Sequence, residues 1–135
     1  MSVQLSVAVR NARLDQIETT IGTAPILRIR SGAPPANCAA TRTGTVLATL
    51  TLPSDWMAAA SGGSKALLGT WEDTSADATG TAGMWEIMDS SATTCHAQGT
   101  VTATGGGGDM TVDNTSFVAA QDFKVNSFTL TDGNA

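Results

Sequence analysis

The side chains most suited to chemistry in this 135-residue sequence are two cysteines and a single histidine. Cys95 stands directly before His96, and a thiol beside an imidazole suits a nucleophile or a metal ligand. No second histidine is present to complete such a site, so we predict no catalytic residue and no metal here. For Cys38 and Cys95 we expect free thiols because a reducing cytoplasm disfavours a disulfide, and a Cys38–Cys95 disulfide remains the alternative.

Acidic residues offer a second possible chemistry. Glu72, Glu86 and Asp89 are candidates for acid–base work, but carboxylates on a half-exposed strand usually face solvent, and we expect Glu86 to do so. The spacing of Asp109, Asp113 and Asp122 does not match a calcium-binding loop of the EF-hand type. A surface calcium gathered from separate loops stays open as an alternative.

The run Gly105–Gly108 resembles a phosphate-binding loop only in its glycine content. It lacks the Lys-Ser/Thr ending of such loops and precedes a predicted strand instead of a helix. We therefore interpret it as a flexible loop tip. Without a nucleophile, a base and a residue to orient them, the sequence predicts a protein that is not an enzyme and has no cofactor.

The composition favours a β domain with little reactive chemistry. Ala, Thr, Gly and Ser make up 67 of the 135 residues, whereas only 4% are aromatic. Glycine does not recur at every third position, which excludes collagen, and the mixture differs from that of a coiled coil or a disordered chain.

Charge is distributed unevenly along the chain. The net charge is −5, yet residues 1–42 carry five arginines against two acids, and residues 43–135 carry two lysines against ten acids. The acidic total predicts no nucleic-acid partner, and no stretch is apolar enough to predict a membrane partner. The asymmetry either reflects a solvated surface or lets the basic N-terminal part dock on an acidic neighbour, such as another copy.

The only good helical pattern covers residues 6–21, within an N-terminal segment 1–22. Val7, Leu14, Ile17 and Ile21 form one apolar stripe, Ser6 suits the N-cap, and Gly22 suits the residue after the helix. The stripe either packs over a sheet or binds a neighbouring subunit. The interface residues that we predict are basic or apolar positions of the N-terminal part: Arg10, Arg13, Leu14, Ile17, Arg28 and Arg30.

Period-two patterns predict strands through residues 23–135. They lie at 25–30, 45–52, 65–72, 83–89, 94–104, 110–112 and 122–131, with a bulge near Ser127 and one helical turn at 54–60. We expect the strands at 83–89 and 94–104 to form an antiparallel hairpin. The fold class is thus all-β: one antiparallel β-sandwich or jelly-roll-like domain with an N-terminal α-helix, whose small core includes the three Trp and three Phe.

Three blocks of sequence resemble a family of small structural proteins. They are VAVRNARLDQIETTIG (7–22), LPSDWMAAASGG (52–63), and GGGGDMTVDNTS with FTLTDGNA near the end. The family is encoded in the virion gene clusters of tailed bacteriophages and prophages, and the likeness spans nearly the whole chain. It implies a virion component and carries no catalytic motif.

From these observations we expect a non-enzymatic tailed-phage structural protein that acts as a capsid decoration or cement protein. Its partners would be the major capsid protein or other virion proteins, and copies of itself. The resemblance implies a location in the virion. Assembly in the host cytoplasm is expected because residues 1–15 lack the pattern of a secretory signal. The alternatives are a tail, collar or fibre-associated protein, and a carbohydrate- or receptor-binding β module that uses the three Trp as a platform.

Overall fold

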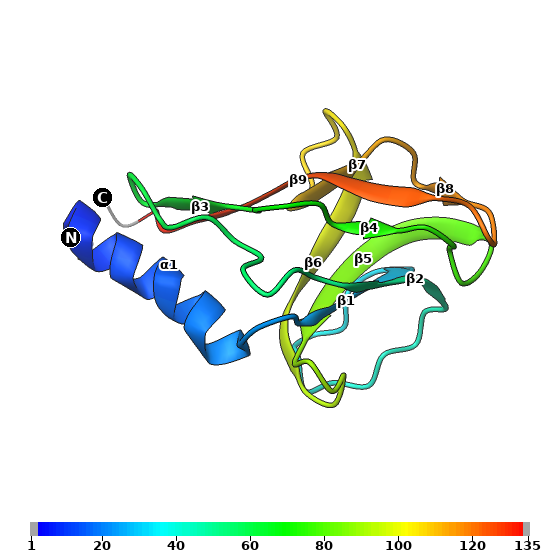
Figure 1. Cartoon of the computed structure of the whole chain (residues 1–135), viewed down its shortest axis with the longest axis horizontal. Coiled ribbons are helices and arrows are strands. Elements are labelled where there is room, and N and C mark those ends of the chain that lie inside the picture. Colours follow the sequence, from blue (N-terminus) through cyan, green and yellow to red (C-terminus); the bar gives the residue numbers. More distant parts are fainter. Residues whose placement is uncertain (1–2, 134–135) are drawn as a thin grey trace.

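The computed structural model describes residues 3–133 and contains one helix followed by nine strands (Figure 1). The helix, α1, covers Val7–Ile21. The Ser6 hydroxyl accepts a hydrogen bond from the Val9 amide at 3.2 Å, and Gly22 ends the helix at a φ of 93°. Both end signals therefore act as predicted, and the all-β class with an N-terminal helix is confirmed.

The strands form one curled sheet with the order β2-β1-β5-β6-β7-β9-β3, while β4 pairs with β9 and β8 pairs with β5. The predicted β5–β6 hairpin is confirmed, and β1 lies between β2 and β5 and pairs antiparallel with both. The strand bounds are β1 Ile26–Ser31, β2 Val46–Thr51, β3 Ser64–Ala66, β4 Glu72–Asp73, β5 Gly80–Met88, β6 Cys95–Ala103, β7 Met110–Val112, β8 Ser116–Phe117 and β9 Phe123–Thr131.

One pairing differs from the antiparallel arrangement that we expected. Strand β7 runs parallel to β6, from the pair Val101–Met110 to the pair Ala103–Val112, and antiparallel to β9. Residues 104–109 carry the chain back beside Val101 before β7 begins, so β7 enters the sheet in the direction of β6. The sheet is therefore mixed.

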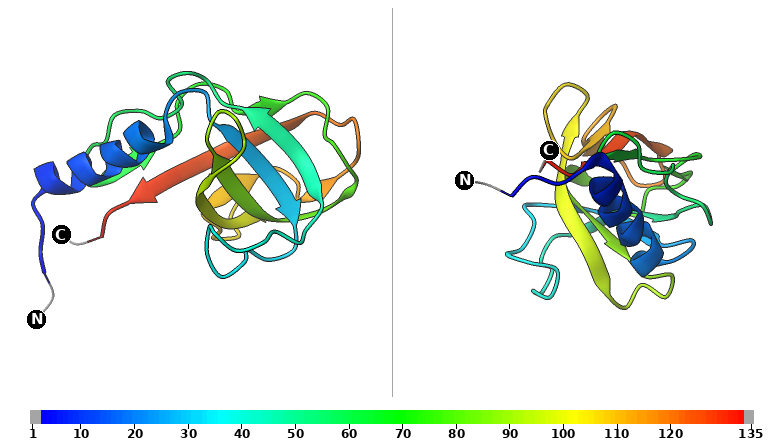
Figure 2. Two further views of the ribbon diagram at one scale, coloured as in Figure 1. Left: turned by 90° about the horizontal axis from the view of Figure 1, so that it is seen from below. Right: turned by 90° about the vertical axis from the view of Figure 1, so that its left-hand side faces the viewer.

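The molecule consists of a rounded body and an arm (Figures 1 and 2). In the body the sheet curls until residues 72–77 reach β2, where the Asp77 amide donates to the Leu47 carbonyl at 2.7 Å. The arm contains α1, β3 and the end of β9, and residues 3–6 continue beyond the helix and away from the body (Figure 2). The helix thus lies beside the end of the sheet and does not cover a sheet face.

The core is built around aromatic side chains, as predicted. Trp71 packs between Trp56 and Phe128 at ring-centroid distances of 6.0 and 5.5 Å, and Trp85 meets Phe128 edge-on at 4.9 Å. All three Trp side chains are buried. They therefore form no exposed platform for a sugar.

Two local predictions are wrong and one is confirmed. Residues 54–60 form no helical turn; the chain bends at 54–55, and Met57 bridges to Leu67. The strand expected at 65–72 is divided into β3 and β4, because the chain turns at Gly69 with a φ of 76°. The predicted bulge in β9 is present, since the register with β7 shifts between Ser127 and Val125.

Candidate functional site

Helix α1 is held on the sheet by a buried lysine that the sequence analysis did not single out. Lys65 on β3 is only 2% exposed, and its Nζ lies 2.7 Å from carboxylate oxygens of both Asp15 and Glu18 and 2.9 Å from the Ala58 carbonyl oxygen. Burial lowers the pKa of Lys65, but its hydrogen bonds to the two carboxylates raise it more, so the net shift is upward. The sequence signal for this contact is a single lysine next to the apolar residues 66–68, because a buried lysine needs acidic partners.

A second contact ties the helix to the end of β9. The Arg13 Nε lies 3.2 Å from a carboxylate oxygen of Asp132, and the Arg10 Nη1 donates to the Asp132 carbonyl oxygen at 3.3 Å. Arg10 also donates to the Leu5 carbonyl oxygen at 3.3 Å, which fixes the chain just before the helix. The predicted interface residues Arg10 and Arg13 therefore bind parts of their own chain.

Three neighbouring recesses form a groove along one side of the arm. The first two share three helix residues, Arg13, Gln16 and Ile17; one extends to Thr131 and the other to His96 on β6. The third, of about 660 Å³, also contains Thr131 and extends between β6 and β9 to the loop at Cys38. Helix α1 lines the first two recesses, β6 lines the second and third, and Thr131 of β9 lines the first and third. It brings Arg13, Leu14 and Ile17 of the predicted interface to one place.

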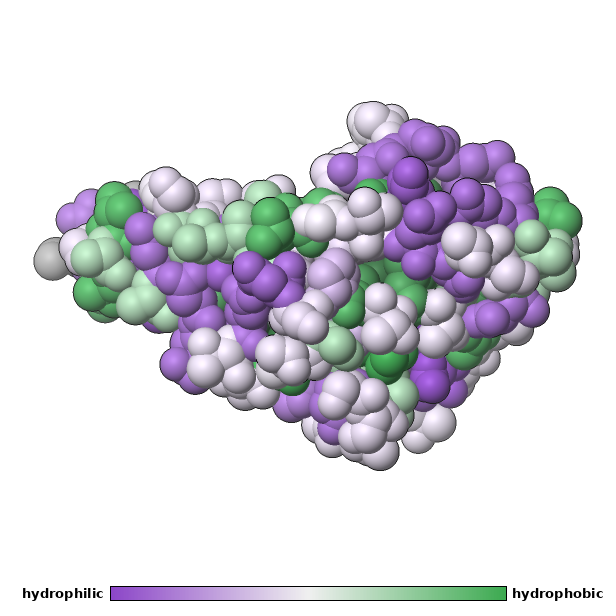
Figure 3. Space-filling model, viewed as in Figure 1, coloured by the Kyte–Doolittle hydropathy of each residue, from purple (hydrophilic) through white to green (hydrophobic). Residues whose placement is uncertain are grey.

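The apolar stripe of α1 is only partly covered. Leu14 and Ile21 are buried, whereas Val7 is 47% exposed and Ile17 is 37% exposed. Among residues 3–133, four of the six large apolar side chains that remain exposed belong to residues 3–17, and Figure 3 shows apolar surface at that end of the molecule. The six are Val3, Val7, Val9, Ile17, Leu68 and Val118.

Glu86 does not face solvent as we predicted, and it pairs with Arg30 of the predicted interface set. Glu86 is 1% exposed instead of facing solvent, and it accepts hydrogen bonds from Arg30 Nε at 3.0 Å and Arg42 Nε at 2.6 Å. The loop before β2 covers this face of β5, and Arg42 also donates to the Ala40 carbonyl oxygen within that loop. Arg30 therefore fixes the loop and lines none of the three recesses.

Arg28 also lies within the body. Its Nη1 is 3.6 Å from the Met88 sulfur across the β1–β5 pair, and it lines none of the groove recesses. The predicted interface set is therefore divided between the arm and the body.

The two cysteines are free thiols that lie close to each other. Burial raises the pKa of Cys95 to about 11, and the adjacent Cys38 thiol adds to this shift. The Cys95 thiol donates to the Ala97 carbonyl oxygen at 3.4 Å. A raised pKa makes Cys95 a poor nucleophile.

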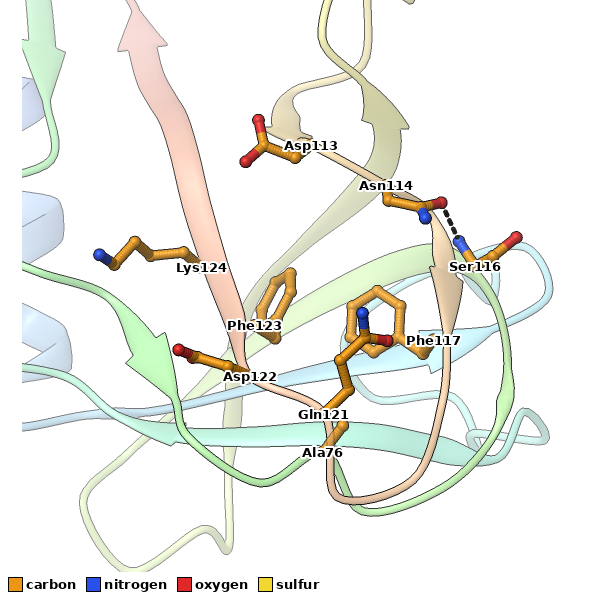
Figure 4. Close-up of a pocket in the computed structure, with 9 residues that line it drawn as sticks. All are labelled: Ala76, Asp113, Asn114, Ser116, Phe117, Gln121, Asp122, Phe123 and Lys124. Atoms are coloured by element: carbon orange, nitrogen blue, oxygen red, sulfur yellow. Dashed lines mark hydrogen bonds between the residues drawn. The ribbon is translucent and has the colours of Figure 1, made fainter.

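A separate recess of about 310 Å³ lies on the body between the β7–β8 connection and β9 (Figure 4). Its side chains include the rings of Phe117 and Phe123, whose centroids are 4.6 Å apart, and the polar groups of Asn114, Asp122 and Lys124. These groups supply hydrogen-bond donors and acceptors for a small polar molecule. They do not include a cysteine, histidine or serine paired with a base.

Within residues 3–133 no three His, Cys, Asp or Glu side chains gather as a metal site would require. Asp109 accepts a hydrogen bond from the Thr100 amide at 3.2 Å, and Asp113 accepts one from Asn126, so the candidate calcium ligands serve other contacts. The helix in this part of the chain is too short and too polar to span a membrane.

Comparison of the chain with protein-family models, with curated proteins and with solved structures finds no match in any of the three.

Proposed function

We propose that this protein is a structural component of a tailed-phage virion and acts as a capsid decoration or cement protein. One observation carries the proposal: the N-terminal segment and α1 expose Val3, Val7, Val9 and Ile17 on an arm that projects from the body. Apolar side chains grouped in this way mark surfaces that bind other proteins. The sequence resemblance to phage structural proteins supplies the setting.

The arm suits attachment to a neighbouring protein for a second reason. Lys65, Arg10 and Arg13 fix the helix to the sheet before any partner binds, so little conformational entropy is lost on docking. The partner that we propose is the major capsid protein or another virion protein. The protein acts by burying surface between adjacent subunits, and no chemical step is involved.

The test is the copy number of the protein in purified virions, measured by quantitative mass spectrometry. Hundreds of copies per particle support a capsid lattice, whereas six or twelve support the alternative of a tail or collar protein. Absence from purified virions would refute both versions of the proposal.

Paired variants connect this test to the arm. Val7→Asp with Ile17→Asp places two charges on exposed positions, so the protein should fold but bind particles at least about tenfold more weakly. Leu68→Asp is the matched control, because Leu68 is 41% exposed and lies outside α1. Equal binding by both variants would remove α1 from the docking surface.

A carbohydrate- or receptor-binding role stays a second candidate with a different site. The Trp side chains that would have formed a platform are buried, and the recess beside Phe117 and Phe123 replaces them as the place to test. Chemical-shift changes at Asn114 and Asp122 on addition of saccharides would support this role.

We also propose that the curled mixed sheet is a distorted jelly-roll-like sandwich. The support is the opposition of β1, β2 and β5 to β4 and β9 across the aromatic core, with residues 72–77 joining the two sides. A solved structure of a relative with the same strand order would test this assignment.

A further inference from the structure

The sheet has a gap between β6 and β9 that one more strand would fill. Strand β7 is three residues long and pairs only with residues 101–103 of β6 and 125–128 of β9. Within residues 3–133, no strand pairs with the facing edges of residues 95–100 of β6 and 129–131 of β9. The recess of about 660 Å³ lies at this place, and we call it the strand gap.

Glycines before β7 create the strand gap. The Gly106 amide donates to the Ala103 carbonyl oxygen and the Gly108 amide to the Thr102 hydroxyl, both at 2.9 Å, so the chain folds back over the end of β6. A Cβ on Gly108 would lie 2.8 Å from the Thr102 side chain, which explains why glycine is needed there. As a result β7 pairs only with residues 101–103 of β6, and the edge of residues 95–100 has no strand beside it.

The backbone of β9 presents hydrogen-bonding groups to the strand gap. The Asp132 amide donates to the Gly63 carbonyl oxygen, and the Phe128 carbonyl oxygen accepts from the Leu67 amide. The even-numbered residues from 128 to 132 therefore direct their backbone groups toward β3 and the residues on either side of it. Because these directions alternate along a strand, Thr129 and Thr131 direct theirs to the opposite edge. Both residues line the recess.

Two buried side-chain atoms in the same recess lack hydrogen-bond partners. They are the Nε1 donor of Trp85, whose residue is 3% exposed, and the Oε1 acceptor of Gln98. The Gln98 amide nitrogen donates to the Pro35 carbonyl oxygen at 2.8 Å, which fixes the orientation of its oxygen. Trp85 pairs with Gly99 and Gln98 with Glu86, so the two side chains leave the sheet on opposite faces and border the recess from either side. The donor and the acceptor are each complementary to one half of a peptide group, which carries both a C=O and an N–H.

The chain itself contains a segment suited to this place. Residues 3–6 are neither helix nor strand and extend away from the body, and Val3 is 75% exposed. Val3 and Leu5 alternate with Gln4 and Ser6, the pattern of a strand with one apolar face. The Leu5 carbonyl oxygen accepts from Arg10 Nε, but no strand pairs with this segment in the described part of the chain. An exposed apolar segment of this kind gains by joining an open sheet edge.

We propose that the strand gap binds the N-terminal segment, residues 3–6, of a second copy of this protein as an added strand beside β9. The carbonyl and amide groups of the added segment pair with Thr129 and Thr131 and satisfy Trp85 Nε1 and Gln98 Oε1. Val3 and Leu5 lose their exposure to water when they enter the gap. The inference concerns the isolated protein and does not depend on the virion.

The first test measures self-association by sedimentation velocity. The wild-type protein should form dimers or larger assemblies at concentrations up to about 200 μM, and Val3→Asp with Leu5→Asp should raise the dissociation constant at least roughly tenfold. Val118→Asp is the control, because Val118 is exposed on the body. A wild-type protein that stays monomeric, or equal effects of the two changes, would overturn the proposal.

A pair of variants at one position tests the backbone contact. Thr131→Pro removes an N–H that faces the strand gap without removing a bond to β3, whereas Thr131→Val keeps the N–H and the side-chain shape. Association should be lost only in the proline variant, with circular dichroism confirming that both variants fold. If both variants associate as the wild type does, the added strand does not use this edge.

Cross-linking identifies the occupant. Cys38 lines the strand gap, so Val3→Cys in a Cys95→Ala background should form a disulfide between two copies when glutathione disulfide accepts the two electrons. The matched control is Val118→Cys in the same background. A disulfide within one chain, or equal yields from both variants, would refute binding of a second copy. Because no virion is used, these outcomes leave the capsid proposal to its own test.

Discussion

Glu86→Gln should destabilise the protein strongly even though it changes only one atom of a side chain. Glu86 is the carboxylate between two arginines whose side chains are 15% and 11% exposed. Removal of its charge leaves both guanidinium groups buried without a counterion. Breaking a buried ion pair from one side costs about 3–5 kcal/mol, and the residual exposure of the arginines favours the lower end, about 3 kcal/mol.

That loss is measurable by two methods. Urea unfolding followed by tryptophan fluorescence should give a free energy of unfolding about 3 kcal/mol below that of the wild type. For a protein of 135 residues the same loss lowers the melting temperature by roughly 10 °C. Glu72→Gln is the control, because Glu72 is partly exposed on β4 and its loss should cost less than about 0.5 kcal/mol.

A triple variant tests the cause of the loss. Replacing Arg30, Glu86 and Arg42 together by Met removes the charges as well as their desolvation, and stability should return to within about 1 kcal/mol of the wild type. If the triple variant is as unstable as Glu86→Gln, the loss comes from packing and not from unpaired charge. If Glu86→Gln is within about 0.5 kcal/mol of the wild type, the argument from burial is wrong.

Three further predictions concern the helix anchor and the cysteines. Lys65→Met should reduce the hydrogen-exchange protection of α1, whereas Lys65→Arg should retain most of it; equal protection in both would contradict the anchoring role. Hydrogen bonds from Lys65 and the Ala60 amide lower the pKa of Asp15 below 3.8, so its stabilising contribution exists above that pH and is lost as pH falls through the lower folded value. The difference in unfolding free energy between wild type and Asp15→Asn should therefore shrink below about pH 4 and be constant from pH 5 to 8. Since the pKa of Cys95 is raised from 9.0 to about 11, iodoacetamide should alkylate it roughly 100-fold more slowly at pH 8 than an unperturbed thiol, as measured by mass spectrometry of the Cys95 peptide from the wild-type protein; an ordinary rate there would refute the effect of burial.

The elements governed by local signals were predictable from the sequence. Ser6 and Gly22 mark the ends of α1 because capping depends on residues within one turn. Alternating apolar residues predicted the β5–β6 hairpin and the strand β9, including its bulge. These features need no knowledge of distant parts of the chain.

Features that depend on distant contacts were not predictable in the same way. The burial of Glu86 depends on the loop that crosses β5, and the alternation of a strand does not reveal such a cover. The direction of β7 depends on the path of residues 104–109, whose glycines permit many conformations. The groove forms where α1 lies beside the end of β9, a contact between residues more than 100 positions apart in the sequence. Of the predicted interface residues, Arg13, Leu14 and Ile17 line it.

The anchors of α1 have a consequence for the order in which the protein folds during synthesis. The helix is made first, yet it is held by Lys65 and by Asp132, which leave the ribosome about 50 and about 120 residues later. An isolated helix of 15 residues is only marginally stable in water. Segment 7–21 therefore remains largely unfolded on the ribosome until β3 is in place, and its final docking waits for the end of β9.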